Sequence, residues 1–184
     1  MKTLILDRDG VINEDSDAFI KSPDEWRPIR GSLEAIARLN HAGYRVAVAT
    51  NQSGIARGLF GIETLNAIHR KLHDQLARVG GQIDLISFCP HGPDDGCRCR
   101  KPLPGLFLGI GDRLNVSLRG VPAIGDSLRD LIAASEAGAT PILVRTGKGR
   151  LTEQALQKEP HFASVPVFDD LAEAVDALLA DVRS

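Results

Sequence analysis

The chain has 184 residues, of which 43% are hydrophobic and 25% are charged. This length and composition are typical of one globular domain, so we expect a single domain over residues 1–184 with one active site. The 22 Lys and Arg residues nearly balance the 24 Asp and Glu residues, which leaves a formal net charge of -2. That balance excludes the strongly basic surface that binds nucleic acid or an anionic membrane.

The start of the chain and its cysteines indicate its compartment. Residues 1–6 lead directly into Asp7, which leaves no room for the apolar core of a signal peptide, and no later apolar run approaches the ~18 residues of a membrane span. All three cysteines lie between Cys89 and Cys99. An odd, tight group of this kind is typical of a metal site rather than of a disulfide framework. We therefore expect a cytoplasmic protein.

Strand-like and helix-like segments alternate along the chain. The first strand is expected at residues 3–6. It is followed by a helix over 33–42, a strand at 45–49, a helix over 63–79, a strand at 83–88, a helix over 106–114, a strand at 121–124, a helix over 128–137 and a strand at 142–144. A short apolar run at 165–168 and a last helix over 171–182 are expected to complete the sheet edge. Four glycines that follow predicted helices are expected to end them in the left-handed conformation: Gly43, Gly80, Gly81 and Gly138.

This alternation predicts the fold class. Strands that alternate with helices form a parallel sheet with helices on both faces, so we expect an α/β fold with a Rossmann-like sheet. In such sheets, ligands bind beyond the C-terminal ends of the strands. The residues that directly follow each predicted strand are therefore the candidates for function.

Polar residues follow four of the predicted strands. The first strand leads into Asp7-Arg8-Asp9-Gly10, the second into Thr50-Asn51-Gln52-Ser53-Gly54, and the fourth into Gly125-Asp126-Ser127. The third leads through the cysteines to Arg100-Lys101-Pro102. These segments are expected to meet at one edge of the sheet.

Asp7, Asp9 and Asp126 form the expected metal site. Gly10 permits an unusual backbone after the first strand, so both Asp7 and Asp9 can face one pocket. The DxDG pattern alone fits a solvated turn equally well. Three carboxylates at one edge would repel each other unless a hard cation lay among them, so Asp126 favours a Mg²⁺ site, with Lys101 as the other positive charge.

This arrangement predicts phosphoryl transfer. A phosphate monoester is negatively charged, so an attacking carboxylate needs the cation and Lys101 to neutralise the ester. We expect Asp7 to be the nucleophile that forms an aspartyl phosphate. Asp9 is expected to protonate the leaving sugar oxygen and then to activate the hydrolytic water. Thr50 is expected to stabilise the phosphoryl oxygens together with Arg100 and Lys101; a helix N-cap is the alternative role for Thr50.

Asp130 lies four residues after Asp126 at the start of a predicted helix, so both carboxylates project near its positive end. Asp126 is nearer the strand and is the expected direct ligand. Asp130 is expected to orient the metal ligands or to cap the helix.

The cysteine cluster predicts a structural zinc site. Cys89 and His91 form one closely spaced pair, Cys97 and Cys99 form the other, and residues 92–96 join them as a flexible loop. Three thiolates and one imidazole fill the four positions of a tetrahedral Zn²⁺ ion and leave none for a catalytic water. Unligated cysteines in a loop are the alternative.

The expected effect of this zinc loop, residues 89–99, is positional. It lies directly before Arg100 and Lys101, so a bound metal would hold both residues in place. His69 and His73 carry no comparable pattern and are expected to be ordinary helix residues.

The order of these motifs resembles the haloacid dehalogenase superfamily. Its members carry four motifs, which here are residues 7–13, residues 50–54, Lys101, and Gly125-Asp126-Ser127 with Asp130. The resemblance covers nearly the whole chain and implies a haloacid dehalogenase-like fold. Asp9 is similar to the second aspartate of the phosphatase branch, because the dehalogenase reaction needs no acid there.

Two stretches resemble one branch more closely. Residues 50–58, and the Cys-x-His pair followed by Cys-x-Cys-Arg-Lys-Pro, are similar to the heptose 1,7-bisphosphate phosphatases, which remove the 7-phosphate. The resemblance implies a magnesium-dependent sugar bisphosphate phosphatase. The β anomer is expected if the product supplies lipopolysaccharide synthesis. Histidinol-phosphate phosphatases share the DRDG opening and the cysteine cluster and remain the alternative; outside enzymes, a non-catalytic zinc-loop binding module is disfavoured by the complete motifs.

Only about twenty residues separate Gly10 from the first predicted helix, so the separate cap domain of larger relatives is not expected. An open pocket leaves recognition to loops, and it suggests a monomer. Arg57 and Arg100 are expected to bind a second phosphate through bidentate hydrogen bonds, although Arg57 also fits an ordinary surface position. The expected substrate contacts are Asp15, Ser16, Asp17, Ala18, Asn51, Gln52, Ser53, Arg57, Arg100 and Lys101.

Overall fold

The protein forms a six-stranded sheet in the computed structural model, which describes residues 2–181. All neighbouring strands are parallel, and their order is β3-β2-β1-β4-β5-β6. The strands are β1 (Lys2–Leu6), β2 (Tyr44–Asn51), β3 (Leu85–Cys89), β4 (Pro122–Gly125), β5 (Thr140–Val144) and β6 (Val167–Phe168). The helices are α1 (Ser32–His41), α2 (Ile62–Arg78), α3 (Gly105–Leu114), α4 (Leu128–Glu136), α5 (Gly149–Leu156) and α6 (Leu171–Asp181), with 3-10 turns η1 (Pro23–Glu25) and η2 (Pro160–Phe162).

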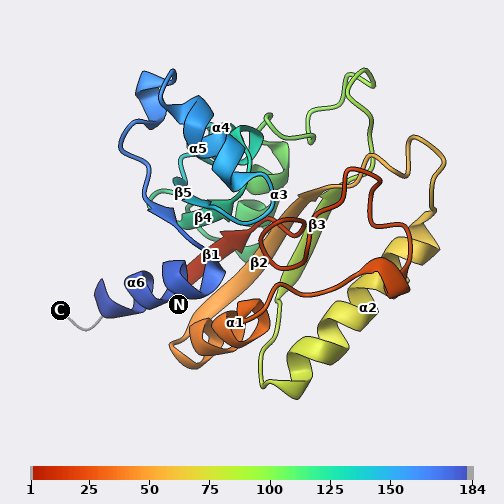
Figure 1. The fold of residues 1–184 in the computed structure, drawn as a ribbon, viewed down its shortest axis with the longest axis horizontal. Helices are drawn as coiled ribbons and strands as arrows, with labels where there is room; N and C mark the ends of the chain where they lie inside the picture. The colour runs from red at the N-terminus through yellow and green to blue at the C-terminus, as the bar shows by residue number, and fades with distance from the viewer. Residues whose placement is uncertain (1, 182–184) are drawn as a thin grey trace.

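Helices cover both faces of the sheet because both faces of its central strands are apolar. Leu4 and Leu6 of β1 are fully buried against one face, whereas Ile5 between them is fully buried in the cluster on the other face. The first layer holds α1, α2 and α6, and the second holds α3 and α4 with α5 beside β5 (Figure 1). The predicted α/β class with a parallel sheet is confirmed.

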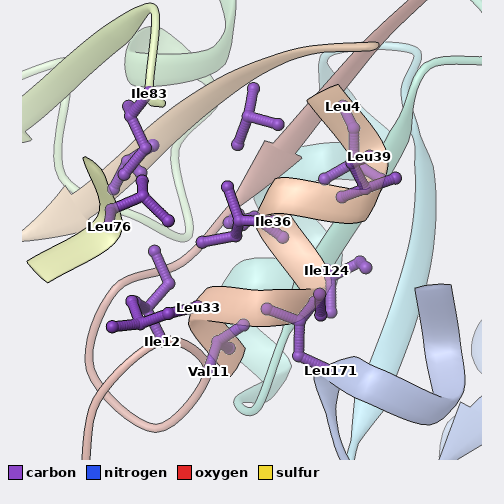
Figure 2. Close-up of a cluster of buried hydrophobic side chains, with 14 of the residues drawn as sticks. Leu4, Val11, Ile12, Leu33, Ile36, Leu39, Leu76, Ile83, Ile124 and Leu171 are labelled. Carbon is purple, nitrogen blue, oxygen red and sulfur yellow. The ribbon is translucent and has the colours of Figure 1, made fainter. Parts of the chain in front are cut away.

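The larger core lies between the sheet and α1. Leu33, Ile36 and Leu39 recur at intervals of three along α1 and point towards the sheet, where they meet Leu4 and Ile124 (Figure 2). Burying one such side chain contributes about 1.5–3 kcal/mol. The core therefore fixes β1 and β4 side by side, and these are the two strands whose C-terminal ends carry the predicted aspartates.

The predicted elements agree with the structure within two residues at each end. The apolar run at 165–168 contains the edge strand β6, which pairs with β5, so its expected place at the sheet edge is confirmed. The last helix is confirmed as α6 to Asp181, and its predicted final residue, 182, lies outside the described part of the chain. Gly43, Gly80 and Gly138 are left-handed as predicted, but Gly81 is not.

Helix α5 is the element that the sequence pattern missed. It is short and begins at Gly149, and Leu151 on it is exposed, so it shows no continuous apolar face. Tertiary contacts hold it instead, because the Thr152 hydroxyl donates to the main-chain oxygen of Asp126 at 2.8 Å. The helix thus attaches to the strand end that carries the candidate site.

Few residues lie above the C-terminal edge of the sheet. Between β1 and α1 the described chain forms only loops and the turn η1, so no cap domain is inserted there, as predicted. None of the described helices combines the length and apolar character needed to cross a membrane.

Candidate active site

A pocket lies at the C-terminal edge of the sheet, beyond β1, β2 and β4. The sheet order places β1 between β2 and β4, so the segments that follow these strands meet there. The pocket is lined by Asp7, Asp9, Asp15, Ser16, Asp17, Phe19, Ile20, Thr50, Asn51, Gln52, Ser53, Arg57, Arg100, Lys101, Asp126, Ser127, Arg129, Asp130 and Lys148.

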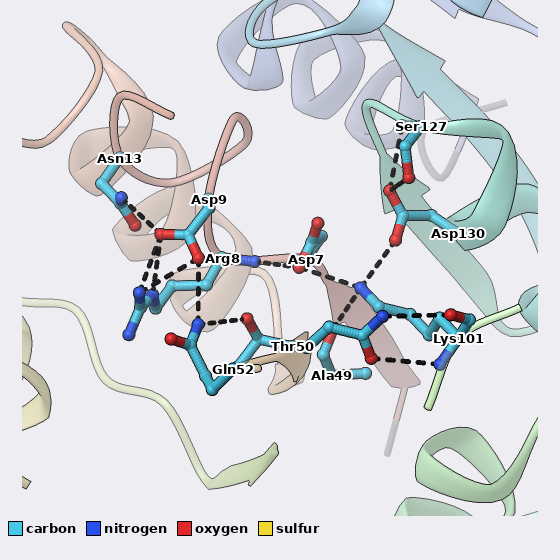
Figure 3. A network of polar contacts seen from close by, with 11 residues as sticks. Asp7, Arg8, Asp9, Asn13, Ala49, Thr50, Gln52, Lys101, Ser127 and Asp130 are labelled. Atoms are coloured by element: carbon cyan, nitrogen blue, oxygen red, sulfur yellow. Dashed lines mark hydrogen bonds and ion pairs between the residues drawn. The ribbon is translucent and has the colours of Figure 1, made fainter. Parts of the chain in front are cut away.

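Lys101 is the buried cation at the centre of the pocket floor. Its side chain is 3% exposed, and its Nζ lies 2.9 Å from Asp7 Oδ1 and 2.6 Å from Asp130 Oδ1. Nζ also donates to the Ala49 main-chain oxygen at 2.8 Å (Figure 3). Burial alone lowers the pKa of Lys101, but the Asp130 and Asp7 carboxylates outweigh it and raise the pKa above its usual value. Lys101 is therefore permanently charged beside Asp7.

Asn51 at the end of β2 sets the position of Lys101. Its side-chain amide donates to the Lys101 main-chain oxygen and accepts from the Lys101 main-chain N–H, both at 3.0 Å. These two bonds join the end of β2 to the segment that precedes α3. The side chain of Asn51 therefore orients Lys101, and its expected contact with a substrate stays a prediction.

Asp7, Asp126 and Asp130 form a carboxylate cluster. One oxygen from each lies within 4.8 Å of the others. Burial and the neighbouring Asp130 charge raise the pKa of Asp7 to about 7, although Lys101 opposes the rise. Burial, Asp130 and Asp7 raise the pKa of Asp126 to about 8. The cluster thus carries more negative charge than Lys101 neutralises, which fits a site for a divalent cation.

Both oxygens of the Asp130 carboxylate have partners within the protein. Ser127 donates to Asp130 Oδ2 from its main-chain nitrogen at 2.9 Å and from its hydroxyl at 2.7 Å, and Lys101 binds Oδ1. Despite burial, Lys101 and these bonds hold the pKa of Asp130 below its usual range. The predicted role of Asp130 as a helix cap is confirmed, because it forms a capping box with Ser127 at the start of α4. It also pairs with Lys101, and its expected role in orienting metal ligands stays a prediction.

Two glycines place their main chain against the Asp126 carboxylate. Gly10, with φ 83°, and Gly147, with φ 56°, flank its carboxylate, and a Cβ on either would lie 2.1 Å from Asp126 Oδ2. The same oxygen accepts from the Lys148 main-chain N–H at 2.8 Å. The unusual backbone expected at Gly10 is confirmed, and it lets the first motif approach Asp126.

Asp9 is held apart from this cluster by donors on its own side of the pocket. The guanidinium of Arg8 donates to both of its oxygens at 2.8–3.1 Å, Asn13 donates to Oδ1 at 2.9 Å, and Gln52 donates to Oδ2 at 2.9 Å (Figure 3). Burial alone raises the pKa of Asp9, but Arg8 and these hydrogen bonds outweigh it and hold the pKa below its usual value. The ligand-free site therefore holds Asp9 ionised.

Thr50 lies in β2 with its side chain in the pocket lining. Its hydroxyl oxygen accepts from Gln52 Nε2 at 2.9 Å. The next helix along the chain, α2, begins at Ile62 with Gly61 as its N-cap. The alternative role of Thr50 as an N-cap is therefore wrong.

The loop after Asn13 differs in detail from the expected contacts. Asp15, Ser16 and Asp17 line the pocket, but Ala18 does not, and Phe19 and Ile20 line it instead. Phe19 adopts φ 66°, which redirects the loop at the residue directly after Ala18. The prediction that Ala18 lines the pocket is therefore wrong.

Three arginines stand on the outer side of the pocket. Arg57 and Arg100 were expected there, and Arg129 of α4 joins them. Burial, then the charges of Arg129 and Arg57, lower the pKa of Arg100. Within the described residues, none of the three has a carboxylate at ion-pair distance. Guanidinium groups without a carboxylate partner have the charge and donors that suit an anion.

Besides Phe19 and Ile20, the sequence analysis missed two charged lining residues, Arg129 and Lys148. Arg129 directly precedes Asp130 at the start of a helix, which is a signal that the motif pattern contained. Lys148 lies in the turn before α5, the helix that the pattern missed, and its Nζ pairs with Asp15 at 3.4 Å. Its place at the site depends on a tertiary contact that no local pattern announces.

The predicted zinc ligands are gathered at the end of β3. Cys89 Sγ lies 3.1 Å from Cys99 Sγ and 3.7 Å from Cys97 Sγ, and His91 Nδ1 lies 3.5 and 3.3 Å from the sulfurs of Cys89 and Cys99. Zn–S bonds of about 2.3 Å in a tetrahedron place ligand atoms roughly 3.8 Å apart. The four side chains thus fit a tetrahedral metal, and Arg100 of the same loop donates to the His91 main-chain oxygen at 3.2 Å.

The sequence and the fold are both similar to proteins of known activity. Residues 2–122 match the family model of polynucleotide kinase 3 phosphatase, and residues 98–174 match the HAD-hydrolase-like model. A D-glycero-β-D-manno-heptose-1,7-bisphosphate 7-phosphatase of Bordetella bronchiseptica is 59% identical over 98% of this chain and 99% of its own length. The corresponding protein of Pseudomonas aeruginosa is 54% identical over 96% of this chain and 97% of its own.

Two solved structures extend the similarity. The heptose 1,7-bisphosphate phosphatase from B. bronchiseptica, in complex with magnesium and phosphate, has a TM-score of 0.94 and 58% identity over 98% of this chain and 99% of that chain. The heptose 1,7-bisphosphate phosphatase from Burkholderia thailandensis has a TM-score of 0.74 and 46% identity over the same shares. The described fold is thus that of these phosphatases over nearly its full length.

Proposed function

The chain belongs to the D-glycero-β-D-manno-heptose-1,7-bisphosphate 7-phosphatases of the haloacid dehalogenase-like hydrolases, and on that basis we propose that it removes the 7-phosphate of this β-configured sugar. The observation that carries the proposal is a carboxylate nucleophile facing one buried cation, with three unpaired arginines at the outer rim. The first part suits the transferred phosphate and the second suits the phosphate that stays on the sugar. Its product would supply heptose for lipopolysaccharide.

The first half-reaction transfers the phosphoryl group to Asp7. An Asp7 oxygen attacks phosphorus, the bond between phosphorus and the sugar oxygen breaks, and the sugar oxygen takes a proton from Asp9. Lys101 neutralises the phosphoryl oxygens, and the Thr50 hydroxyl donates to them. The contacts of Asp9 favour its ionised form, so it must first take up a proton from solvent. The negative charge of the arriving phosphate raises the pKa of Asp9 and favours this uptake.

The second half-reaction hydrolyses the aspartyl phosphate. Asp9, now a carboxylate, takes a proton from water as the water oxygen attacks phosphorus. The bond between phosphorus and the Asp7 oxygen breaks, which frees inorganic phosphate and returns the Asp7 carboxylate. The ionised state that Arg8 favours at Asp9 suits this step.

Magnesium is the proposed catalytic cation. The raised pKa values of Asp7 and Asp126 show an uncompensated cluster of oxygen ligands, which is the donor type that Mg²⁺ prefers. Arg8 binds the Asp9 carboxylate, so Asp7 and Asp126 are the proposed ligands, and the expected metal contact of Asp9 stays a prediction. When bound, the cation would neutralise the negative phosphoryl oxygens.

Zinc is the proposed structural metal of residues 89–99. Protein purified without chelator is expected to contain one zinc per chain, and Cys97→Ser is expected to lose the metal. Freed from it, the loop would displace Arg100 and Lys101 and lower activity about a hundredfold. Elemental analysis and phosphate release measure both effects, with Asp94→Asn in the same loop as the control. A zinc-free native protein, or a fully active zinc-free variant, would contradict this.

Arg129 is proposed to bind the phosphate that is not transferred. Replacing Arg129 by Ala removes one charged hydrogen-bond donor, so KM for the bisphosphate is expected to rise about tenfold or more. The kinetics of a monophosphate should not change, because it does not reach the rim. Arg119→Ala, an exposed arginine away from the pocket, is the matched control. Equal effects on the two substrates would exclude Arg129 from the distal contact.

Phosphate release from four substrates tests the proposed function. The β and α anomers of the heptose bisphosphate, histidinol phosphate and p-nitrophenyl phosphate are compared at equal concentration with Mg²⁺. Histidinol phosphate carries an ammonium group, which the three arginines would repel, so it is expected to be a poor substrate. Preference for it, or hydrolysis of none of the four, would overturn the proposal. A monomer in the cytoplasm is the expected form, and sedimentation tests the monomer.

A further inference from the structure

A fully buried arginine lies beneath the proposed proton-transfer residue. The side chain of Arg8 is 0% exposed, and its Nε and NH2 groups donate to Asp9. A buried guanidinium is costly unless its donors find partners. The remaining nitrogen, NH1, has its partner on a different element, because it lies 3.2 Å from Nε2 of His69 in α2.

The contact fixes the form of the His69 ring. A guanidinium can only donate, so His69 Nε2 must accept and the ring proton must lie on Nδ1. Burial and the Arg8 charge lower the pKa of His69 to about 3, in keeping with a neutral ring. Phe88 of β3 packs edge-on to the imidazole, with ring centroids 6.4 Å apart. His69 is therefore not the ordinary helix residue that the sequence suggested.

We propose that His69 is a positioning residue for the proton transfers of Asp9, because it holds the guanidinium that holds the Asp9 carboxylate. His69 does not touch the reacting atoms itself; it acts through Arg8, which binds the Asp9 carboxylate. The inference rests on the proposed function, in which Asp9 donates and then accepts a proton. Its geometric part, a chain of contacts from α2 through Arg8 to Asp9, stands on the distances alone.

A role limited to packing makes a different prediction from a role in positioning. His69→Leu keeps an apolar side chain beside Phe88 but leaves Arg8 NH1 without an acceptor. His69→Gln is less apolar but supplies a carbonyl oxygen in place of Nε2. Packing favours the Leu variant, and positioning favours the Gln variant.

The test separates the two half-reactions with p-nitrophenyl phosphate. Its leaving group needs no proton, so the initial burst of nitrophenol does not depend on Asp9, whereas hydrolysis of the aspartyl phosphate does. His69→Leu is expected to keep the burst rate within about threefold and to slow steady-state turnover about a hundredfold. His69→Gln should retain turnover within about fivefold, and His73→Leu, an exposed residue of the same helix, should match wild type.

Several outcomes overturn this inference. They are equal activity of the Leu and Gln variants, equal loss of burst and turnover, or no loss at all. Nitrogen NMR of wild type identifies which nitrogen of the His69 ring carries the proton and does not depend on catalysis. A proton on Nε2 instead of Nδ1 would also overturn the inference. If wild type hydrolyses the aryl phosphate but not the heptose bisphosphate, the proposed substrate fails while the His69 variants still decide this inference.

Discussion

Replacing Asp7 by Asn is expected to reduce phosphate release by about a millionfold, because an amide cannot form the acyl phosphate and no neighbouring carboxylate can replace it. Asp130 is committed to Lys101 and Ser127, and Asp126 is held beside Lys148. Acid quenching of wild type during turnover should trap a phosphorylated Asp7 peptide that mass spectrometry detects. The variant should yield none. Retention of about a tenth of the activity would exclude covalent catalysis by Asp7.

The same substitution should stabilise the metal-free protein. The pKa of Asp7 rises from 3.8 to about 7 on folding, so its ionisation opposes folding increasingly as pH rises through this interval. Asn removes that opposition, which amounts to up to about 4 kcal/mol above pH 7 and vanishes near pH 4. Urea unfolding in chelator at pH 4 and pH 8 measures it. If the difference in unfolding free energy between Asp7→Asn and wild type does not grow with pH, the ionised Asp7 carboxylate does not destabilise the fold.

Replacing Lys101 by Met is expected to damage both stability and catalysis. Asp7 and Asp130 would lose their shared buried cation, which costs about 3–5 kcal/mol of unfolding free energy at neutral pH. Loss of the charge beside the phosphoryl group should lower kcat about a thousandfold. Urea unfolding and phosphate release at saturating Mg²⁺ are the measurements, and Lys158→Met, an exposed lysine, is the control.

The pH dependence distinguishes a charge effect from a packing effect at Lys101. Without Lys101 the two carboxylates can take up protons as the pH falls and then need no cation, so the destabilisation by Lys101→Met should shrink towards pH 4. A loss of stability that is constant between pH 4 and pH 8 would mean that the lysine stem, and not its charge, matters.

The sequence predicted what depends on strands and their order. Parallel strands end at one edge of the sheet, and this rule suffices to bring together Asp7 after β1 and Asp126 after β4. It also brings in Lys101, which follows β3 and residues 89–99. The gathering of Cys89, His91, Cys97 and Cys99 could also be predicted, because short Cys and His spacings leave few possible geometries. In both cases local sequence fixes the residue and the sheet fixes its neighbours.

The rest depended on contacts across the chain. Asp9 lines the pocket as expected, but the sequence did not reveal that Arg8 binds its carboxylate or that Arg8 in turn contacts His69 of α2. Lys148 directly precedes α5, which is held by the Thr152 hydrogen bond beyond the end of β4 and by one buried leucine, Leu156, rather than by a repeating apolar pattern. Ala18 was wrongly predicted to line the pocket because Phe19 adopts a left-handed backbone conformation. A residue other than glycine rarely adopts this conformation, so the sequence did not indicate it.

The glycines around Asp126 make the floor of the pocket intolerant of substitution, whereas its rim can accept new side chains. Any side chain at Gly10 or Gly147 would overlap the Asp126 carboxylate, so a mutant library should find no replacement at these positions. The rim is built from exposed side chains such as Arg57 and Arg129, which can be exchanged one at a time at little structural cost. New substrates can therefore be acquired at the rim while the chemistry beneath it is inherited unchanged.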